Sequence, residues 1–335
     1  MADDDMTALV ADGHGKDTAS ALARLRVARV PRPQPKPGQV LVKIAAAPCN
    51  PADFYYLEGR YGIDRPLPAT PGFEGAGEVV ASGGGMLGRW LVGKRVACGG
   101  HACTGTWAEY VVTASDQCLP LRKELSFDQG ATAVANPMTA LSLIGLARQG
   151  GHRAYVNTGA AGQLGKMIRA IGDERGLVGI HVVRRKEHVT ALGADHVLDS
   201  SAPDFAAQLA AKCRELGATI AFDAVAGAMT GALANALCEG GEVVIYGALD
   251  GKPSGTVDPM DLCFRHKRIR GFELAGHLKT LGMLGSMRLG TAAQKLVARG
   301  LAATQVRDRV PLAEAPARLA EYAAAMSDGK MLLVP

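Results

Sequence analysis

No other stretch of the chain limits its possible folds as strongly as the turn Ala160-Ala161-Gly162-Gln163-Leu164-Gly165. Apolar runs at 154–158 and 177–183 predict strands on either side of it, and residues 166–171 predict a helix directly after it. A glycine turn in this position lets the backbone approach a pyrophosphate and directs helix N–H groups at the anion. The order predicts a dinucleotide site that uses Ala160, Gly162, Gln163 and Leu164. Because Ala160 replaces the first glycine of the pattern, an ordinary strand-to-helix turn remains the alternative.

The residues after the second strand indicate which nucleotide binds. An NAD site has an acidic residue near this point, but the sequence here is Val183-Arg184-Arg185-Lys186. Arginines bind a phosphate through paired hydrogen bonds, so Arg184 and Arg185 suit the 2′-phosphate of NADPH. We therefore expect NADPH as the cofactor, and the alternative is a solvated basic turn.

Strand and helix signals divide the chain into regions of different character. Short strand signals separated by Gly and Pro dominate up to residue 121, for example at 7–11 and 40–44. A helix is predicted from a capping box at Ser126 through about residue 147, with Pro137 expected to kink or break it. Strands are then expected at 154–158, 177–183, 196–199, 219–223, 242–247 and 269–274, alternating with helices. This alternation predicts an α/β fold with a doubly wound parallel sheet. A helix at 313–326 and a strand at 330–334 follow.

Composition excludes several classes of function. The net charge is only +5, the basic residues are scattered and aromatic residues are few, so no nucleic-acid partner is expected. No apolar run reaches the ~18 residues that a membrane span needs. The first residues are acidic and resemble no targeting segment, and the cysteines are odd in number and dispersed, so a cytoplasmic protein with reduced thiols is expected. Cys98, His101 and Cys103 lie close in sequence but lack a fourth ligand, which makes a structural zinc site a weak hypothesis.

Three short segments match motifs of a known superfamily most specifically, and the resemblance as a whole extends over essentially the entire chain. They are 37–44, Pro71-Gly72-Phe73-Glu74-Gly75-Ala76-Gly77, and Gly105-Thr106-Trp107-Ala108-Glu109-Tyr110. Together they resemble motifs of the medium-chain dehydrogenase/reductase superfamily. The resemblance implies a GroES-like β-rich catalytic domain at 1–121, a Rossmann NADP-binding domain at 122–268, and a return to the catalytic domain at 269–335.

One departure from the family pattern concerns the metal. Zinc alcohol dehydrogenases of this superfamily bind the metal through a His where this chain has Phe73, and through a Cys where it has Asn50, with Cys49 one residue away. Phenylalanine cannot ligate zinc, so no metal is expected. The chain thus resembles the zinc-free NADPH:quinone oxidoreductases and 2-enoyl thioester reductases.

Further segments are similar to the same branch, among them 50–53, 57–62, 136–140, 246–253 and 267–272. The resemblance implies an NADPH-dependent reductase that transfers hydride to a small-molecule acceptor: a quinone, an enone or an enoyl thioester. The alternatives are a zinc-type alcohol dehydrogenase and a non-catalytic nucleotide-binding protein.

The resemblance also implies roles for individual residues. Tyr61 is the expected hydrogen-bond donor to the acceptor oxygen, and Asn50 is expected to orient the substrate or the nicotinamide ribose. Residues expected near the nicotinamide are Thr139, Tyr246, Gly247 and Phe264. Four of these residues have a structural alternative: a rim phenol for Tyr61, a turn residue for Asn50, a buried helix hydroxyl for Thr139 and core packing for Phe264. A homodimer that pairs the strand near 268–274 is expected as well.

Overall fold

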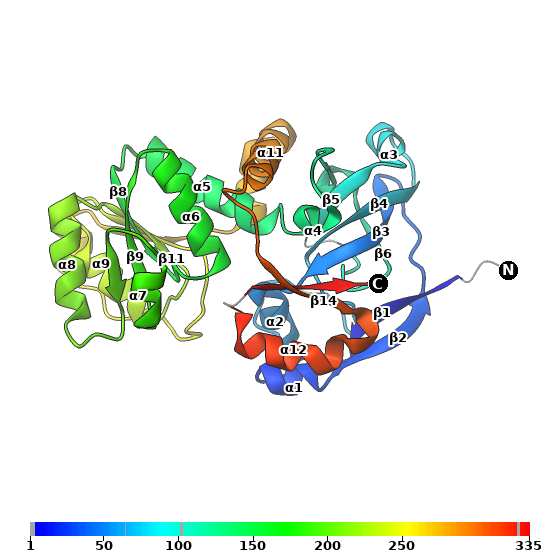
Figure 1. Ribbon diagram of the computed structural model, residues 1–335, viewed down its shortest axis with the longest axis horizontal. Helices are drawn as coiled ribbons and strands as arrows, with labels where there is room; N and C mark the ends of the chain where they lie inside the picture. Colours follow the sequence, from blue (N-terminus) through cyan, green and yellow to red (C-terminus); the bar gives the residue numbers. More distant parts are fainter. Residues whose placement is uncertain (1–3, 64, 101–102, 327–328) are drawn as a thin grey trace. The chain divides into compact units, whose positions relative to one another are not determined.

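The computed structural model describes residues 4–63, 65–100, 103–326 and 329–335. The chain forms two compact units, drawn in Figure 1. The first unit contains Met1–Ala135 and Gly282–Pro335, and the second contains Asn136–Leu281. The chain therefore passes between units at 135/136 and 281/282, whereas the sequence placed the changes at 121/122 and 268/269.

The first unit is built on a mainly antiparallel sheet. Its strand order is β14-β15-β3-β4-β5-β7, and β6 also pairs with β3. A separate hairpin pairs β1 with β2. The strands are β1 (Asp5–Ala11), β2 (Leu25–Pro31), β3 (Gln39–Pro48), β4 (Glu74–Ser82), β5 (Arg95–Gly99), β6 (Tyr110–Ala114), β7 (Leu119–Pro120), β14 (Val306–Pro311) and β15 (Lys330–Val334). The helices are α1 (Thr18–Leu22), α2 (Pro51–Leu57), α3 (Met86–Leu91), η1 (Ser115–Gln117), α4 (Phe127–Ala131), η2 (Leu312–Glu314) and α12 (Ala315–Ala324).

The core of this unit joins segments from both ends of the chain. Trp107 is completely buried and donates its indole N–H to the carbonyl of Pro48. Tyr322 of α12 is also completely buried, and its hydroxyl donates to the carbonyl of Cys49 at 2.9 Å. The loop that leads into α2 is therefore held from two sides.

The second unit contains the parallel sheet that the alternating pattern predicts. Its strand order is β10-β9-β8-β11-β12-β13, and all neighbours are parallel. The chain reverses its direction of travel across the sheet beside β8, which is the switch point where such folds bind ligands. The strands are β8 (Ala154–Thr158), β9 (Val178–Val183), β10 (Val197–Asp199), β11 (Ile220–Asp223), β12 (Glu242–Ile245) and β13 (Arg268–Gly271). The helices are α5 (Ala135–Gln149), α6 (Gln163–Glu174), α7 (Glu187–Ala191), α8 (Phe205–Leu216), α9 (Ala228–Ala236) and α10 (Pro259–Phe264). Helix α11 (Leu274–Ala298) begins in this unit and belongs to the first unit from Gly282 onward.

Alternate residues of β8 face opposite sides of this sheet. Tyr155 points toward α6, and its hydroxyl lies 3.4 Å from the carbonyl oxygen of Ile168. Ala154 and Val156 pack instead in a core cluster with residues of α8 and α9. Helices thus cover both faces, which confirms the doubly wound arrangement.

Two local expectations need correction. The helix predicted from Ser126 onward is interrupted at 132–134, and Pro137 lies in the first turn of α5, where a missing N–H breaks no helical bond. The strand expected at 242–247 ends at Ile245, so Tyr246 and Gly247 follow the strand. Among the helices that the structure describes, none is long and apolar enough to cross a membrane.

Candidate cofactor-binding and catalytic sites

The glycine turn joins β8 to α6 through a tight backbone loop. Gly159 has a φ of 61°, a conformation that favours glycine, and its carbonyl accepts the N–H of Gly162 at 3.0 Å. Gly162 is the N-cap of α6, and no side chain caps this helix. The first turn therefore presents backbone N–H groups to an anion, as a pyrophosphate site requires.

Close packing of α6 against the turn requires small residues. A Cβ added to Gly165 would lie 2.5 Å from the carbonyl oxygen of Gly159, and Ala160 is completely buried. Gln163 and Leu164 lie half-buried in the first turn. Asn157 of β8, which sequence reasoning missed, donates its amide N–H to the carbonyl of Gly165 at 2.9 Å. A polar residue inside an apolar strand was the available signal for this bond.

The basic residues follow the neighbouring strand, β9. Val183 is buried at the end of β9, whereas Arg184 and Arg185 are exposed. Arg185 forms a long ion pair with Glu187, with 3.9 Å between Nη1 and Oε1. Because β8 and β9 are parallel, both cations lie beyond the sheet edge from which the glycine turn leaves. This arrangement fits a nucleotide that carries an extra phosphate.

Asp223 is the last residue of β11, the strand next to β8, and it holds the turn that follows at the carboxyl edge of the sheet. It was not identified from the sequence. Its buried carboxylate accepts the hydroxyls of Thr158 and Thr230 at 3.0 and 2.7 Å, and the N–H groups of Val225 and Ala226 at 2.9 and 3.1 Å. Ala226 has a φ of 61°, which is unfavourable for a residue with a side chain. Asp223 thus fixes a strained turn at the carboxyl end of β11.

The four residues expected near the nicotinamide do not share one environment. Tyr246 donates its backbone N–H to the carbonyl of Asp223 at 2.9 Å, and Gly247 follows at the same edge. Burial and the nearby Asp223 charge raise the pKa of the Tyr246 hydroxyl, so it stays neutral. Thr139 is buried within α5, while Phe264 is 72% exposed at the end of α10. The sheet edge therefore brings together the glycine turn, the arginines, Tyr246 and Gly247.

In the first unit, the candidate catalytic residues flank α2. Asn50 is the N-cap of this helix and forms a capping box with Asp53, while Pro51 occupies the first turn. Tyr61 follows the helix in a loop and is partly buried. Its ring lies 5.2 Å from that of Phe73, which also meets the ring of Tyr56 edge-on at 5.6 Å. Tyr61 is thus held against an aromatic cluster.

A buried polar network connects Asn50 to distant parts of the chain. The Nζ of Lys330 donates to Oδ1 of Asn50 at 2.7 Å and to the carbonyl of Cys49 at 3.1 Å. The Nδ2 of Asn50 donates to Oε1 of Glu74 at 2.8 Å. The other oxygen of Glu74 accepts the N–H of Ala135, which begins α5. Both ends of the Asn50 amide are therefore bonded within the protein.

Burial shifts the titration of the charged groups in this region. Desolvation raises the pKa of Asp53 to about 7, and it also raises the pKa of Glu74. Desolvation lowers the pKa of Lys330, although Glu74 and the Cys49 and Asp53 groups oppose this shift. The network therefore holds one ammonium group near two carboxyl groups, of which Asp53, with a pKa of about 7, is about half protonated near neutral pH.

Phe73 is the residue that the sequence resemblance assigned to the position of the zinc-binding histidine. The Arg65 guanidinium carbon lies 5.2 Å from the centre of the Phe73 ring, and Arg65 Nη2 lies 3.7 Å from Sγ of Cys103. Burial raises the pKa values of Cys49, Cys98 and Cys103, which favours protonated thiols. Within the described residues, no three His, Cys, Asp or Glu side chains form a group that would hold a metal ion. His101 of the weak zinc hypothesis lies outside those residues.

Two family models match the chain. The model for the alcohol dehydrogenase GroES-like domain matches residues 36–123, and the model for zinc-binding dehydrogenases matches residues 172–283. The mitochondrial enoyl-[acyl-carrier-protein] reductase of Arabidopsis thaliana is 30% identical over 81% of this chain and 72% of that protein. Its counterpart from Xenopus tropicalis is 30% identical over 79% of this chain and 76% of that protein.

Solved structures show the same architecture over nearly the full length. A Mesorhizobium loti protein assigned as an NADPH:quinone reductase is 34% identical, with a TM-score of 0.89 and 99% coverage of both chains. A mycobacterial protein solved in complex with NADPH is 25% identical, with a TM-score of 0.81 and coverage of 98% of this chain and 100% of that one. The comparisons confirm the two-part fold expected from the sequence.

Proposed function

Because this chain belongs to the medium-chain dehydrogenase/reductase superfamily, in its branch of quinone oxidoreductases and enoyl thioester reductases, we propose that it is a zinc-free, NADPH-dependent reductase. Its acceptor is a quinone or an activated double bond conjugated to a carbonyl or thioester. The observation that carries the cofactor assignment is the pair Arg184 and Arg185, exposed beyond β9 beside the glycine turn.

The residues of the second unit fit the cofactor in distinct ways. The uncapped start of α6 binds the pyrophosphate. Gly162, which has no side chain, lets the phosphates approach the backbone, and Gly165 lets α6 pack closely on the turn. Arg184 and Arg185 bind the 2′-phosphate through charge-assisted hydrogen bonds. We assign Tyr246, Gly247 and Thr139 to the nicotinamide end. Phe264 is left out of this set, because α10 ends beside the amino end of β12, where Gly240 donates its N–H to the carbonyl of Arg265. When bound, the nicotinamide ring supplies the hydride.

The residues of the first unit act on the acceptor. When hydride reaches the β-carbon of an enone or enoyl thioester, negative charge builds on the carbonyl oxygen, and a proton must reach the α-carbon. Tyr61 donates a hydrogen bond to that oxygen, which stabilises the charge in the transition state. Asn50 has both amide ends bonded, so its contribution is to orient the loop that leads to Tyr61. No step needs a metal, in agreement with Phe73 at the position of the zinc-binding histidine.

We also propose that the protein is a cytoplasmic homodimer. All seven cysteines are unpaired, as in reducing compartments. β13 lies at the edge of the parallel sheet, and unpaired edge groups favour pairing with a second copy around a two-fold axis. The dimer would extend the sheet through this strand.

An acceptor panel tests the proposed activity. Oxidation of NADPH is followed at 340 nm with a quinone, an enone, an enoyl thioester and, in the reverse direction, a primary alcohol with NADP⁺. Turnover of one of the first three supports the proposal. Turnover of the alcohol alone would favour an alcohol dehydrogenase, and tight NADPH binding without any turnover would favour a non-catalytic nucleotide-binding protein.

A further inference from the structure

Helix α3 packs on the first unit with one side and faces outward with the other. Gly88 and Leu91 are buried, and a Cβ added to Gly88 would lie 2.5 Å from the hydroxyl oxygen of Ser82 in β4. Directly after the helix, Gly93 donates its N–H to the carbonyl of Val79 at 2.8 Å. The helix is therefore fixed closely on β4, and its position does not depend on the outward side chains.

The outward side of α3 and the residue that follows the helix carry large apolar side chains. Met86 is 85% exposed, Trp90 is 53% exposed, and Leu87 and Val92 are 37% and 46% exposed. We call these four residues the α3 patch. The chain has two tryptophans, and the other, Trp107, is completely buried in the core. Neighbouring apolar residues with such exposure mark a surface that something else covers.

Positive charge borders the α3 patch. Residues 79–108 contain no Asp or Glu, but they include Arg89, Lys94 and Arg95. The preceding Glu78 lies opposite Arg95 in the ladder of β4 and β5. Arg89 and Lys94 form no ion pair within the part of the chain that the structure describes. Two cations beside the patch are thus left without an acidic partner there.

The segments next to α3 add one charge of each sign. Lys36 is exposed in a loop that Gly83 approaches closely, since a Cβ on Gly83 would lie 2.2 Å from the Lys36 carbonyl oxygen. Asp116 is exposed in η1 beside Ser115, whose hydroxyl oxygen would lie 3.2 Å from a Cβ on Gly88. The surroundings of the patch therefore keep a net positive charge, and what covers it should be negative.

We propose that the α3 patch binds the surface of a phospholipid bilayer that carries anionic headgroups. The Nζ of Lys94 lies 4.4 Å from the centre of the Trp90 ring. This pair suits the boundary of a bilayer, because an indole prefers the interface and a lysine extends its ammonium to the headgroups. Met86 and Leu87 would enter the acyl region, while Arg89 and Lys94 would meet lipid phosphates. A bilayer yields to a convex group, so the patch needs no groove.

A second copy of the chain fits the α3 patch less well. In a two-fold contact a patch meets its own copy, so Arg89 and Lys94 would approach the same cations of the other chain. A different protein would need a concave apolar face with acidic residues to receive a convex patch. A bilayer supplies both the apolar interior and the negative charge at any point of its surface.

Binding to a bilayer is separate from turnover. It needs neither NADPH nor an acceptor, so it is measured on the protein alone. Only one consequence rests on the proposed function: an enzyme held at a bilayer would meet acceptors that dissolve in lipid. Reduction of acceptors in solution by a protein that ignores vesicles would contradict the bilayer proposal and leave the proposed activity intact.

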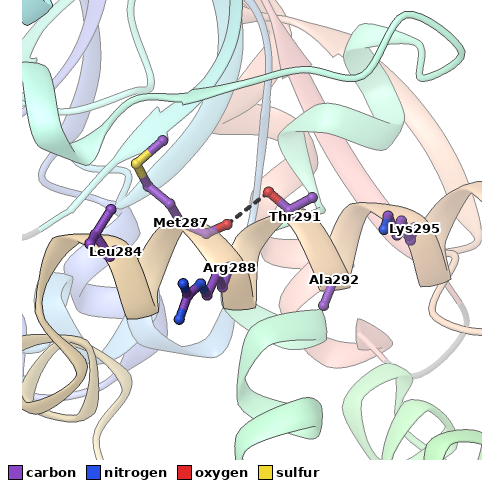
Figure 2. Close-up of a pocket in the computed structure, with 6 residues that line it drawn as sticks. All are labelled: Leu284, Met287, Arg288, Thr291, Ala292 and Lys295. Carbon is purple, nitrogen blue, oxygen red and sulfur yellow. Dashed lines mark hydrogen bonds between the residues drawn. The ribbon is translucent and has the colours of Figure 1, made fainter.

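Helix α11 offers a matched control site. Leu284 and Met287 are 66% and 44% exposed, and Figure 2 shows both on this helix, which also carries basic side chains. Residues 274–307 contain no Phe, Trp or Tyr. The control variant Leu284→Ser/Met287→Ser therefore removes the same two residue types as Met86→Ser/Leu87→Ser, at a site that lacks an aromatic residue.

Cosedimentation with vesicles measures the binding. Wild-type protein should sediment with vesicles of phosphatidylcholine and phosphatidylserine, less with pure phosphatidylcholine, and less again when salt is added. Met86→Ser/Leu87→Ser should weaken binding to the mixed vesicles at least about tenfold, because two apolar side chains no longer enter the acyl region. The α11 variant should stay within about twofold of the wild type. Absence of wild-type binding, or equal losses in the two variants, would overturn the proposal.

Fluorescence identifies the surface that meets the lipid. Because Trp107 is buried, a change on adding vesicles reports on Trp90. Its emission should shift to shorter wavelength and be quenched by lipids with brominated acyl chains, and Trp90→Phe should abolish both signals. Sedimentation with vesicles without quenching would mean that another surface binds them.

Light scattering tests the alternative of a second copy. Met86→Ser/Leu87→Ser should leave the mass of the protein in solution equal to that of the wild type. A wild-type oligomer that this variant splits would show that the α3 patch is an interface between copies, and it would overturn the bilayer proposal.

Discussion

The ammonium nitrogen of Lys330 lies 2.7 Å from the amide oxygen of Asn50, although 280 residues separate them in sequence. The Asn50 amide oxygen accepts from Lys330, so the amide nitrogen is the end that faces Glu74 and donates to it. The loop before α2 is therefore oriented by the strand β15, and Glu74 extends the connection to the first N–H of α5. The surroundings of Tyr61 consequently depend on residues from both ends of the chain.

We predict that Arg185→Ala weakens NADPH binding about ten- to a hundredfold. Loss of a charge-assisted contact with the 2′-phosphate costs roughly 1.5–3 kcal/mol, while NADH has no phosphate there to lose. Fluorescence titration with both nucleotides measures the change, and Arg175→Ala on the exposed end of α6 is the control. A wild-type protein that binds both nucleotides equally would contradict the assignment.

Active protein is expected to contain no stoichiometric zinc. Phe73 occupies the ligand position, and burial keeps the nearby Cys49 and Cys103 thiols protonated, which disfavours metal binding. Activity should survive dialysis against a chelator, and mass spectrometry of the active fraction should find far less than one zinc ion per chain. Inactivation by the chelator with recovery on adding zinc would refute this expectation.

Tyr61→Phe is expected to lower kcat on an enone or enoyl thioester by about 10²–10³, the usual cost of removing one preorganised donor. The substitution keeps the ring that packs on Phe73 and removes only the hydroxyl. The NADPH dissociation constant should stay within about twofold, because the bond strengthens only in the transition state. With a quinone the loss should be smaller, since water can protonate its oxygens. If the Tyr61→Phe variant turned over every acceptor at the wild-type rate, the Tyr61 hydroxyl would have no catalytic role.

The buried Asp53 should make stability fall as pH rises from about 4 to about 7. Its folded pKa of about 7 exceeds the ordinary value of 3.8, so across this window the folded state holds a proton that the unfolded state has lost. This group alone gives a slope of roughly 1.4 kcal/mol per pH unit. Glu74 and Lys330 face the same site and titrate as well.

Comparison with Asp53→Asn isolates this contribution, because the neighbours Glu74 and Lys330 are present in both proteins. Urea denaturation at several pH values should show the variant gaining stability relative to the wild type between pH 5 and 7. Parallel stability curves for the two proteins would mean that Asp53 is ionised throughout this range.

Light scattering at micromolar concentration should give twice the chain mass of 34.8 kDa. Ile269→Pro removes a backbone donor from the edge strand β13 and should shift the protein toward monomers. The matched change Ile63→Pro lies in the first unit, away from any strand, and should leave the mass unchanged. A wild-type monomer would contradict the proposed pairing.

Local patterns explain what could be predicted from the sequence. The glycine turn and the strands and helix beside it follow one another directly in sequence, and the alternation of strand and helix signals continues through the unit, so local patterns were sufficient to predict the parallel sheet although β8 pairs with β11, 65 positions away. The network of Asn50, Glu74 and Lys330 depends on contacts across most of the chain, and nothing near Lys330 marks it as buried. Asp223 stands at the end of an apolar strand, a position where a solvent-exposed aspartate is common. Only the four donors that surround it in the folded protein show that it is a buried structural residue. The role of Tyr61 stays a prediction.

The bond between Asn50 and Lys330 also has a consequence for the order of events during synthesis. At translation rates of about 5–20 residues per second, residue 330 is added roughly 10–40 seconds after residue 135. The second unit is continuous in sequence and has all its strands well before then, whereas the first unit still lacks β14 and β15. The nucleotide-binding half can thus fold on the ribosome first, and the loop around Asn50 acquires its final hydrogen bonds only when nearly the whole chain has been made.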